Sequence, residues 1–71
     1  VPFEEAITAL ADPAGLTAPD LVAPRRAVTI GASALSRMLF VVHTESLRGG
    51  RVRIISARKA SATQRRRYEE G

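Results

Sequence analysis

Apolar residues recur at two different periods along the chain, and the change of period separates helices from strands. Phe3, Ile7 and Leu10 follow Pro2 at helical spacing, which predicts a short amphipathic helix that ends near Asp12. Residues 27–31, 37–45 and 51–58 are rich in β-branched residues, which is typical of strands. A short extended piece at 16–18 precedes them.

The end of the chain predicts a second helix. Ser61 and Gln64 have the spacing of a capping box, in which each side chain binds the backbone amide of the other residue. A helix from Ala62 to Glu70 follows. We therefore expect one α+β domain over residues 1–71, with an antiparallel meander of three to four strands and a helix at each end.

The small size of the chain favours a partner. With 71 residues and no cysteine, the domain has a thin margin of stability and no disulfide to reinforce it. The spacing of its residues predicts no metal site, no cofactor motif, no signal peptide and no membrane span, so we expect a cytoplasmic protein.

Charge is divided unevenly along the chain. The net charge is +4, yet the first 24 residues contain four acidic side chains and no basic one. From Arg25 onward, eleven basic side chains face three acidic ones, which is a net charge of +8. This distribution indicates a polyanion as the ligand, although a solvated surface is the simpler explanation.

A hairpin brings candidate catalytic residues together. If the loop 46–50 places Glu45 opposite Arg51, then His43 falls opposite Arg53, and all four side chains point to one face. The other face is then the predicted core, and it carries Phe40, Val42, Thr44, Val52 and Ile54.

This patch contains the groups that metal-free RNA cleavage needs. His43 can act as acid or base, Glu45 can act as base or orient His43, and Arg53 and Arg58 can hold the scissile phosphate. Arg51 adds a further cation that can bind RNA. The alternative is an ordinary Glu45–Arg51 ion pair, with His43 as a polar strand residue.

The last helix adds a second group of candidates. Arg65 and Arg66 can bind RNA phosphates together with Lys59 of the preceding strand, and Tyr68 can stack on a base. Alternatively, Tyr68 packs the helix onto the sheet, while Arg65 and Arg66 pair with the two glutamates that follow them.

The ordered motifs resemble the BrnT family of type II toxins. The resemblance rests on Phe3-Glu4-Glu5-Ala6, Ala11-Asp12-Pro13, Val28-Thr29-Ile30-Gly31, Val41-Val42-His43-Thr44-Glu45, Arg53-Ile54-Ile55-Ser56-Ala57-Arg58-Lys59-Ala60 and Arg66-Arg67-Tyr68-Glu69-Glu70. It implies a RelE-like fold and a ribonuclease that inhibits translation. It also implies neutralisation by a BrnA antitoxin, which carries a ribbon-helix-helix domain.

Two features depart from the family pattern. Members usually begin with a Trp-Asp strand and a helix ending in Lys-His-Gly, both placed before the position of Val1, and many have Glu where Gln64 stands. Three functions follow as hypotheses. The first is a metal-independent endoribonuclease, the second a non-catalytic nucleic-acid-binding module, and the third a truncated remnant that binds its antitoxin.

Overall fold

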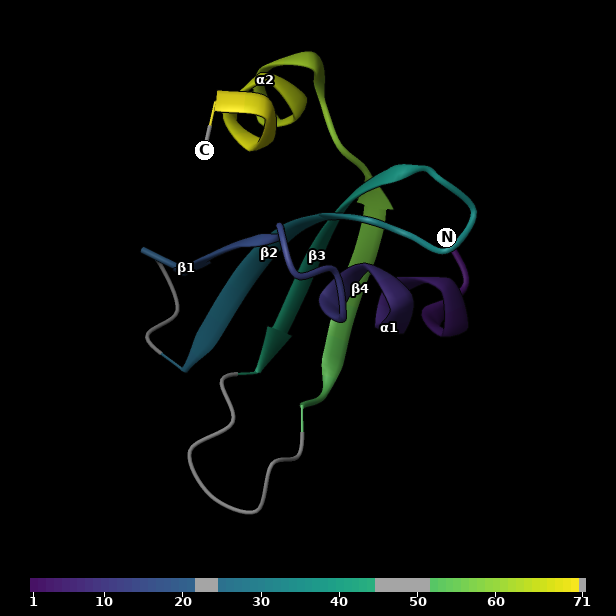
Figure 1. Cartoon of the computed structure of the whole chain (residues 1–71). Coiled ribbons are helices and arrows are strands. Elements are labelled where there is room, and N and C mark those ends of the chain that lie inside the picture. Colours follow the sequence, from purple (N-terminus) through teal and green to yellow (C-terminus); the bar gives the residue numbers. More distant parts are fainter. Residues whose placement is uncertain (22–24, 45–51, 71) are drawn as a thin grey trace.

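The computed structural model describes residues 1–21, 25–44 and 52–70. In chain order its elements are α1 (Phe3–Leu10), β1 (Leu16–Pro19), β2 (Arg26–Ala32), β3 (Met38–Thr44), β4 (Ile54–Lys59) and α2 (Ala62–Glu70). The strands form one antiparallel sheet in the order β1-β2-β3-β4 (Figure 1). This arrangement confirms the predicted α+β meander with a helix at each end.

Helix α1 packs closely against one face of the sheet. Ala6 and Ala9 form the core cluster with Leu39 and Val41 of β3. The approach allows only small side chains, because a Cβ added to Gly31 of β2 would lie 2.4 Å from the carbonyl oxygen of Ala9. Alanine on the helix and glycine on the strand therefore decide which side of α1 is buried.

The buried side of α1 is not the apolar side that predicted the helix. Phe3 and Ile7 are 53% and 58% exposed, whereas Glu5 is buried between α1 and the β2–β3 turn. Both oxygens of the Glu5 carboxylate are bound by Arg37, and Ser33 donates a hydrogen bond of 2.7 Å to it. A buried charge is tolerated here because it is fully paired.

The two faces of the sheet are reversed relative to our prediction. Leu39, Val41 and His43 point toward α1 and are buried, whereas Phe40 and Val42 point away and are half-buried. The prediction that Phe40 and Val42 face the core is therefore wrong. Both faces of β3 are apolar, so the alternation alone could not show which one α1 covers. We call the face away from α1 the open face.

The register of β4 also differs from the prediction. His43 pairs with Ile54 instead of Arg53, and Val42 pairs with Ser56, so Ile55 is an extra, bulged residue. Strand β4 begins at Ile54 and not at residue 51. As a result Ile54 packs against the core cluster, and Arg53 stands before the strand as an exposed residue.

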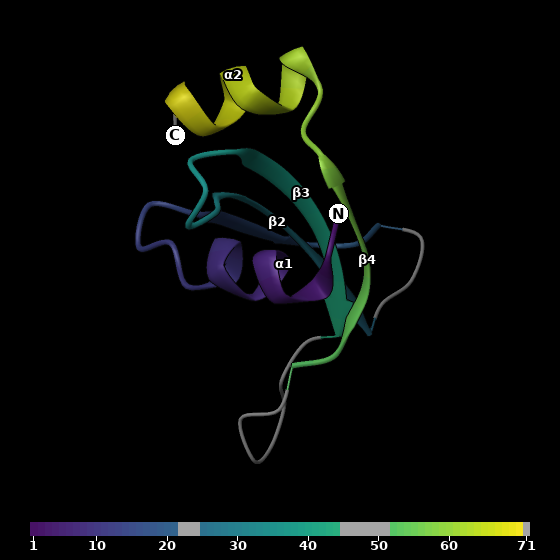
Figure 2. The same ribbon diagram turned by 90° about the vertical axis from the view of Figure 1, so that its right-hand side faces the viewer.

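Helix α2 lies across one end of the sheet, on the side away from α1 (Figure 2). The predicted capping box is present, because Gln64 Oε1 accepts the amide of Ser61 at 2.9 Å and Ser61 Oγ accepts the amide of Gln64 at 3.2 Å. No residue of α2 is buried. The hydroxyl of Tyr68 donates a 2.7 Å hydrogen bond to Asp12, which ties the helix to the segment after α1.

Neither helix within the described ranges is long and apolar enough to cross a membrane.

Candidate functional site

His43 is buried on the face that α1 covers. Its side chain is 6% exposed, and both ring nitrogens are hydrogen-bonded. Nδ1 lies 3.0 Å from the carbonyl oxygen of Thr44, which can only accept, so Nδ1 carries the proton. In the neutral ring Nε2 then accepts the hydroxyl of Thr29 at 2.7 Å. This nitrogen has the lone pair of a base, but Thr29 occupies it.

A chain of hydroxyls connects His43 to the surface. Thr29 Oγ1 lies 2.8 Å from Thr17 Oγ1 on β1, and Thr17 is exposed whereas Thr29 is 3% exposed. Because Thr29 donates to His43, it accepts from Thr17. The imidazole therefore reaches solvent through two hydroxyls on its own face of the sheet.

Arg58 lies on the open face of the sheet, whereas His43 lies on the other face. Its guanidinium carbon lies 4.5 Å from the centroid of the Phe40 ring, and Nη1 donates weakly to the carbonyl of Lys59 and to Gln64 at 3.3 and 3.4 Å. Arg58 pairs with Phe40 across the strands, so both point away from α1. No carboxylate of the described residues forms an ion pair with it. Its charge is free to meet an anion.

Of the other predicted members of the catalytic patch, the structure describes Arg53 and Arg58, and neither shares the face of the sheet that holds His43. Arg53 is exposed, and its backbone pairs with Thr44, whose Oγ1 accepts the Arg53 amide at 2.9 Å. Glu45 and Arg51 lie outside the described residues. The predicted face that joins His43 to Arg53 is therefore wrong, because His43 pairs with Ile54 and Arg53 comes one residue earlier, on the opposite face of the sheet.

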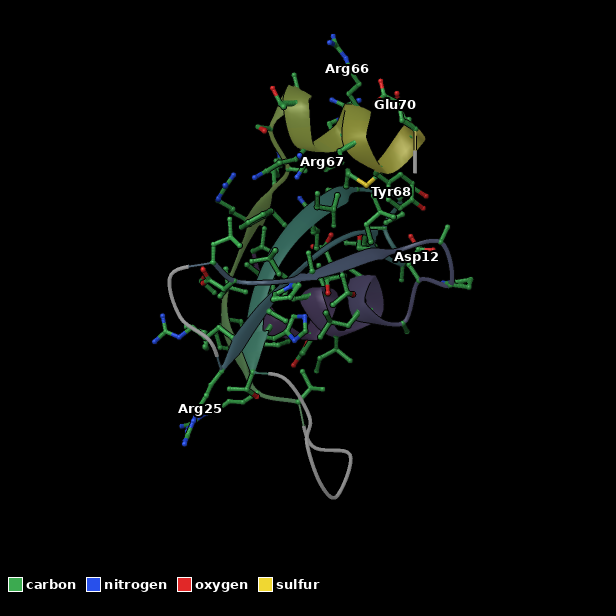
Figure 3. All side chains as sticks on the ribbon, turned by 90° about the vertical axis from the view of Figure 1, so that its left-hand side faces the viewer. Asp12, Arg25, Arg66, Arg67, Tyr68 and Glu70 are labelled. Carbon is green, nitrogen blue, oxygen red and sulfur yellow. The ribbon has the colours of Figure 1, made fainter. Side chains whose placement is uncertain are left out.

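The side chains of α2 divide between the sheet and solvent. Figure 3 shows Tyr68 pointing toward Asp12, Arg67 on the side of α2 that faces the sheet, and Arg66 pointing away from it. The sequence prediction had included Arg66 and omitted Arg67. Arg67 comes three residues after Gln64 and shares its face of the helix, whereas Arg66 does not. Because the Gln64 side chain contacts Arg58 of the sheet, this spacing is the signal that would have separated Arg67 from Arg66.

Hydrogen bonds shift the pKa values at the Tyr68 contact. The hydrogen bond to Asp12 raises the pKa of Tyr68 above its ordinary value. The amide of Ala32, the Tyr68 hydroxyl and the amide of Ala14 together lower the pKa of Asp12. Both shifts favour a neutral phenol beside a charged carboxylate, which supports the alternative that Tyr68 docks the helix.

Lys59 and Arg65 do come together, in a pocket at the end of the sheet. The pocket has a volume of about 360 Å³, and Arg37 also lines it. Sequence reasoning missed Arg37 and Phe40, whose partners lie far away in the chain. Among the described residues no cluster of three or more His, Cys, Asp or Glu side chains could hold a metal ion.

Comparison with known proteins identifies the family. The model of a family described as the ribonuclease toxin, BrnT, of a type II toxin-antitoxin system matches residues 1–64 of the 71-residue chain. No curated protein matches the chain. The match covers both the α1-sheet unit and the capping box of α2, and it spans five of the six motifs that suggested the resemblance, the sixth being residues 66–70. The chain thus belongs to the BrnT family of ribonuclease toxins.

Proposed function

We propose that this chain is a metal-independent endoribonuclease toxin that binds RNA across its open face and acts in the cytoplasm to inhibit translation. The observation that carries the proposal is Arg58, an exposed guanidinium supported by Phe40 and unpaired by any described carboxylate. Stacking on the ring holds the guanidinium in place while its donors stay available to a phosphate. The family supplies the class of reaction.

In this proposal the 2′-oxygen of a ribose attacks the adjacent phosphorus, and the bond to the 5′-oxygen breaks. A base takes the proton of the 2′-hydroxyl, and an acid returns a proton to the leaving oxygen. Arg58 neutralises the charge that builds on the phosphate, and Arg53 and Arg67 hold the strand on either side. Arg66 would contact the flanking RNA, and Tyr68 would also do so if α2 moves.

His43 has one of two roles. Proton transfer by the imidazole, as predicted from the sequence, would have to pass through Thr29 and Thr17, because the ring is buried. Otherwise His43 is a positioning residue that holds β2 against β3. Glu45, predicted as base or as the group that orients His43, keeps that role as a proposal.

Cleavage of a fluorescent RNA by the purified chain in EDTA tests the proposal. Arg58→Ala should lower kcat by about 100-fold, the usual effect of losing one group that stabilises the transition state. Arg25→Ala removes the same charge at the other end of the sheet and should retain activity (Figure 3). Equal activity of the two variants would exclude Arg58 from the site.

His43→Asn separates the two roles of His43. The amide can still bond Thr29, so a positioning role predicts a modest loss with an unchanged pH profile of kcat. A proton-transfer role predicts the loss of one limb of that profile. His43→Ala, which leaves Thr29 without its partner, measures the cost of the hydrogen bond by comparison.

A non-catalytic role is the second candidate. It is favoured by the separation of His43 and Arg58 onto opposite faces, which leaves no described acid or base beside the arginine. Wild-type chain that binds RNA but leaves it intact would support it. In either case the family implies an antitoxin partner, and we propose one of the BrnA type with a ribbon-helix-helix domain.

A further inference from the structure

A second cationic site lies apart from the open face, in the pocket between α2, the β2–β3 turn and the end of β4. Four charged side chains line it: Arg37, Lys59, Arg65 and Glu69. With a volume of about 360 Å³, the pocket has room for a phosphate and part of the nucleotide that carries it. The β2–β3 turn is distant in sequence from the end of β4 and α2, so no local sequence motif predicts the pocket.

The charges in this pocket do not cancel. Arg37 is neutralised by Glu5, since its Nε and one Nη bind the two carboxylate oxygens. Lys59 and Arg65 are exposed and form no ion pair with any described carboxylate. Glu69, one turn after Arg65, is the single acid in the lining. The pocket therefore presents an excess of positive charge to a small anion.

The position of Lys59 relates this pocket to the open face. Arg58 and Lys59 are consecutive in β4, so their side chains leave the strand on opposite faces. Arg58 lies over Phe40, and Lys59 lines the pocket at the same end of the strand. A polyanion that follows the end of β4 would meet both in succession.

We infer that this pocket binds a phosphate group of the RNA strand, next to the phosphate held by Arg58, through Lys59 and Arg65. The inference rests on the proposed function only in taking RNA as the ligand. It adds a phosphate subsite that fixes how the strand continues beyond the cleaved bond. Glu69 weakens this subsite, and that opposing charge provides a sensitive test.

Binding is measured by fluorescence anisotropy with a 2′-O-methyl RNA, which cannot be cleaved, so cleavage and binding are scored separately. Lys59→Ala and Arg65→Ala together should weaken binding about tenfold at low salt. They should also reduce the slope of log K against log salt by about 0.7, the value for one single-strand phosphate. Two matched comparisons then separate local from general charge effects.

The first matched variant is Arg25→Ala, which removes a positive charge far from the pocket and should change affinity less than about twofold. The second pair is Glu69→Gln against Glu70→Gln, neighbours of equal charge of which only Glu69 lines the pocket. Glu69→Gln should strengthen binding by about threefold, and Glu70→Gln should not. A residue with a merely structural role would not improve binding when its charge is removed.

Three results would overturn the inference. One is a double variant at Lys59 and Arg65 that binds like Arg25→Ala. Another is an equal response to the two glutamate substitutions. The third is that the pocket binds a free anion and not RNA. In that case inorganic phosphate would shift the NMR signals of the Lys59 and Arg65 side chains, and RNA would leave them unchanged. Intact RNA with these binding effects present would contradict the proposed cleavage and leave the subsite standing.

Discussion

At the scale of single residues, the structure separates side chains that share a motif. His43 and Arg58 belong to two of the motifs that suggested the family, yet His43 is buried on the face that α1 covers and Arg58 lies on the open face. The sequence identifies both side chains as candidates for RNA chemistry by their residue types. Their relation in space depends on one bulged residue, Ile55, which no pattern of alternation reveals.

The backbone conformation of Ser36, and not its side chain, is expected to affect the stability of the protein. Among the described residues Ser36 is the one non-glycine residue with a positive φ, 61°, and it closes the β2–β3 turn. Ser36→Gly should stabilise the protein by about 0.5–1 kcal/mol, because the left-handed strain exceeds the entropy cost of glycine. Urea denaturation measures this.

The control for Ser36 is Ala34→Gly in the same turn. Ala34 has no positive φ, so glycine there brings only the entropy cost and should destabilise slightly. Equal effects of the two substitutions would show that the turn stores no strain at Ser36.

At the scale of elements, α2 is joined to the rest of the described structure by contacts near the surface. It buries no residue, and its described links to the body include the Tyr68–Asp12 and Arg58–Gln64 hydrogen bonds. A helix of nine residues is marginal on its own. Its capping box and these contacts therefore decide whether it stays folded against the sheet.

Tyr68→Phe should release α2 without unfolding the sheet. The substitution removes the hydrogen bond to Asp12, while the amides of Ala32 and Ala14 continue to bind the carboxylate. We expect faster hydrogen exchange at the amides of α2 and unchanged protection in β3, because the sheet core lies under α1. Unchanged exchange in α2 would mean that other contacts dock the helix.

Short-range sequence patterns were sufficient to predict most helices and strands, but they did not predict how these elements pack. The capping box of Ser61 and Gln64 predicted the start of α2 correctly, since both partners lie within one turn. The apolar positions predicted α1 but not its buried side, because the close approach of Gly31 admits Ala9 and excludes Phe3 and Ile7.

At the scale of the whole molecule, the paired charges of Glu5 and Arg37 join the N-terminal helix to the sheet. Hydrogen bonds from Arg37 and Ser33 lower the pKa of Glu5 from 4.5 to about 2. The same contact raises the pKa of Arg37. Glu5 is therefore charged in the folded protein at pH values where it is protonated in the unfolded chain.

This shift makes stability depend on pH. The stabilisation by Glu5 is complete above its unfolded pKa of 4.5 and is lost as the pH falls toward about 2. Glu5→Gln should lower the free energy of unfolding at pH 7 and flatten its decline between these values. Glu4→Gln, at the exposed neighbouring position, should leave the curve of the wild type unchanged.

Thermal unfolding followed by circular dichroism between pH 2 and 7 measures both variants. Part of the acid dependence should remain in Glu5→Gln, since the pKa of Asp12 is also lowered in the folded state. If the thermal stability of Glu5→Gln depended on pH as strongly as that of the wild type, the Glu5–Arg37 pair would not stabilise the fold.

The sequence by itself determined the order of the elements, the positive charge after residue 25 and the residue types available for RNA chemistry. These follow from local propensity and from composition. The tertiary structure alone decided that His43 is buried, that Phe40 supports Arg58 and that Arg37 meets Glu5. These depend on which sheet face α1 covers and on the bulge in β4, and neither is encoded by the alternation of apolar and polar residues along one strand.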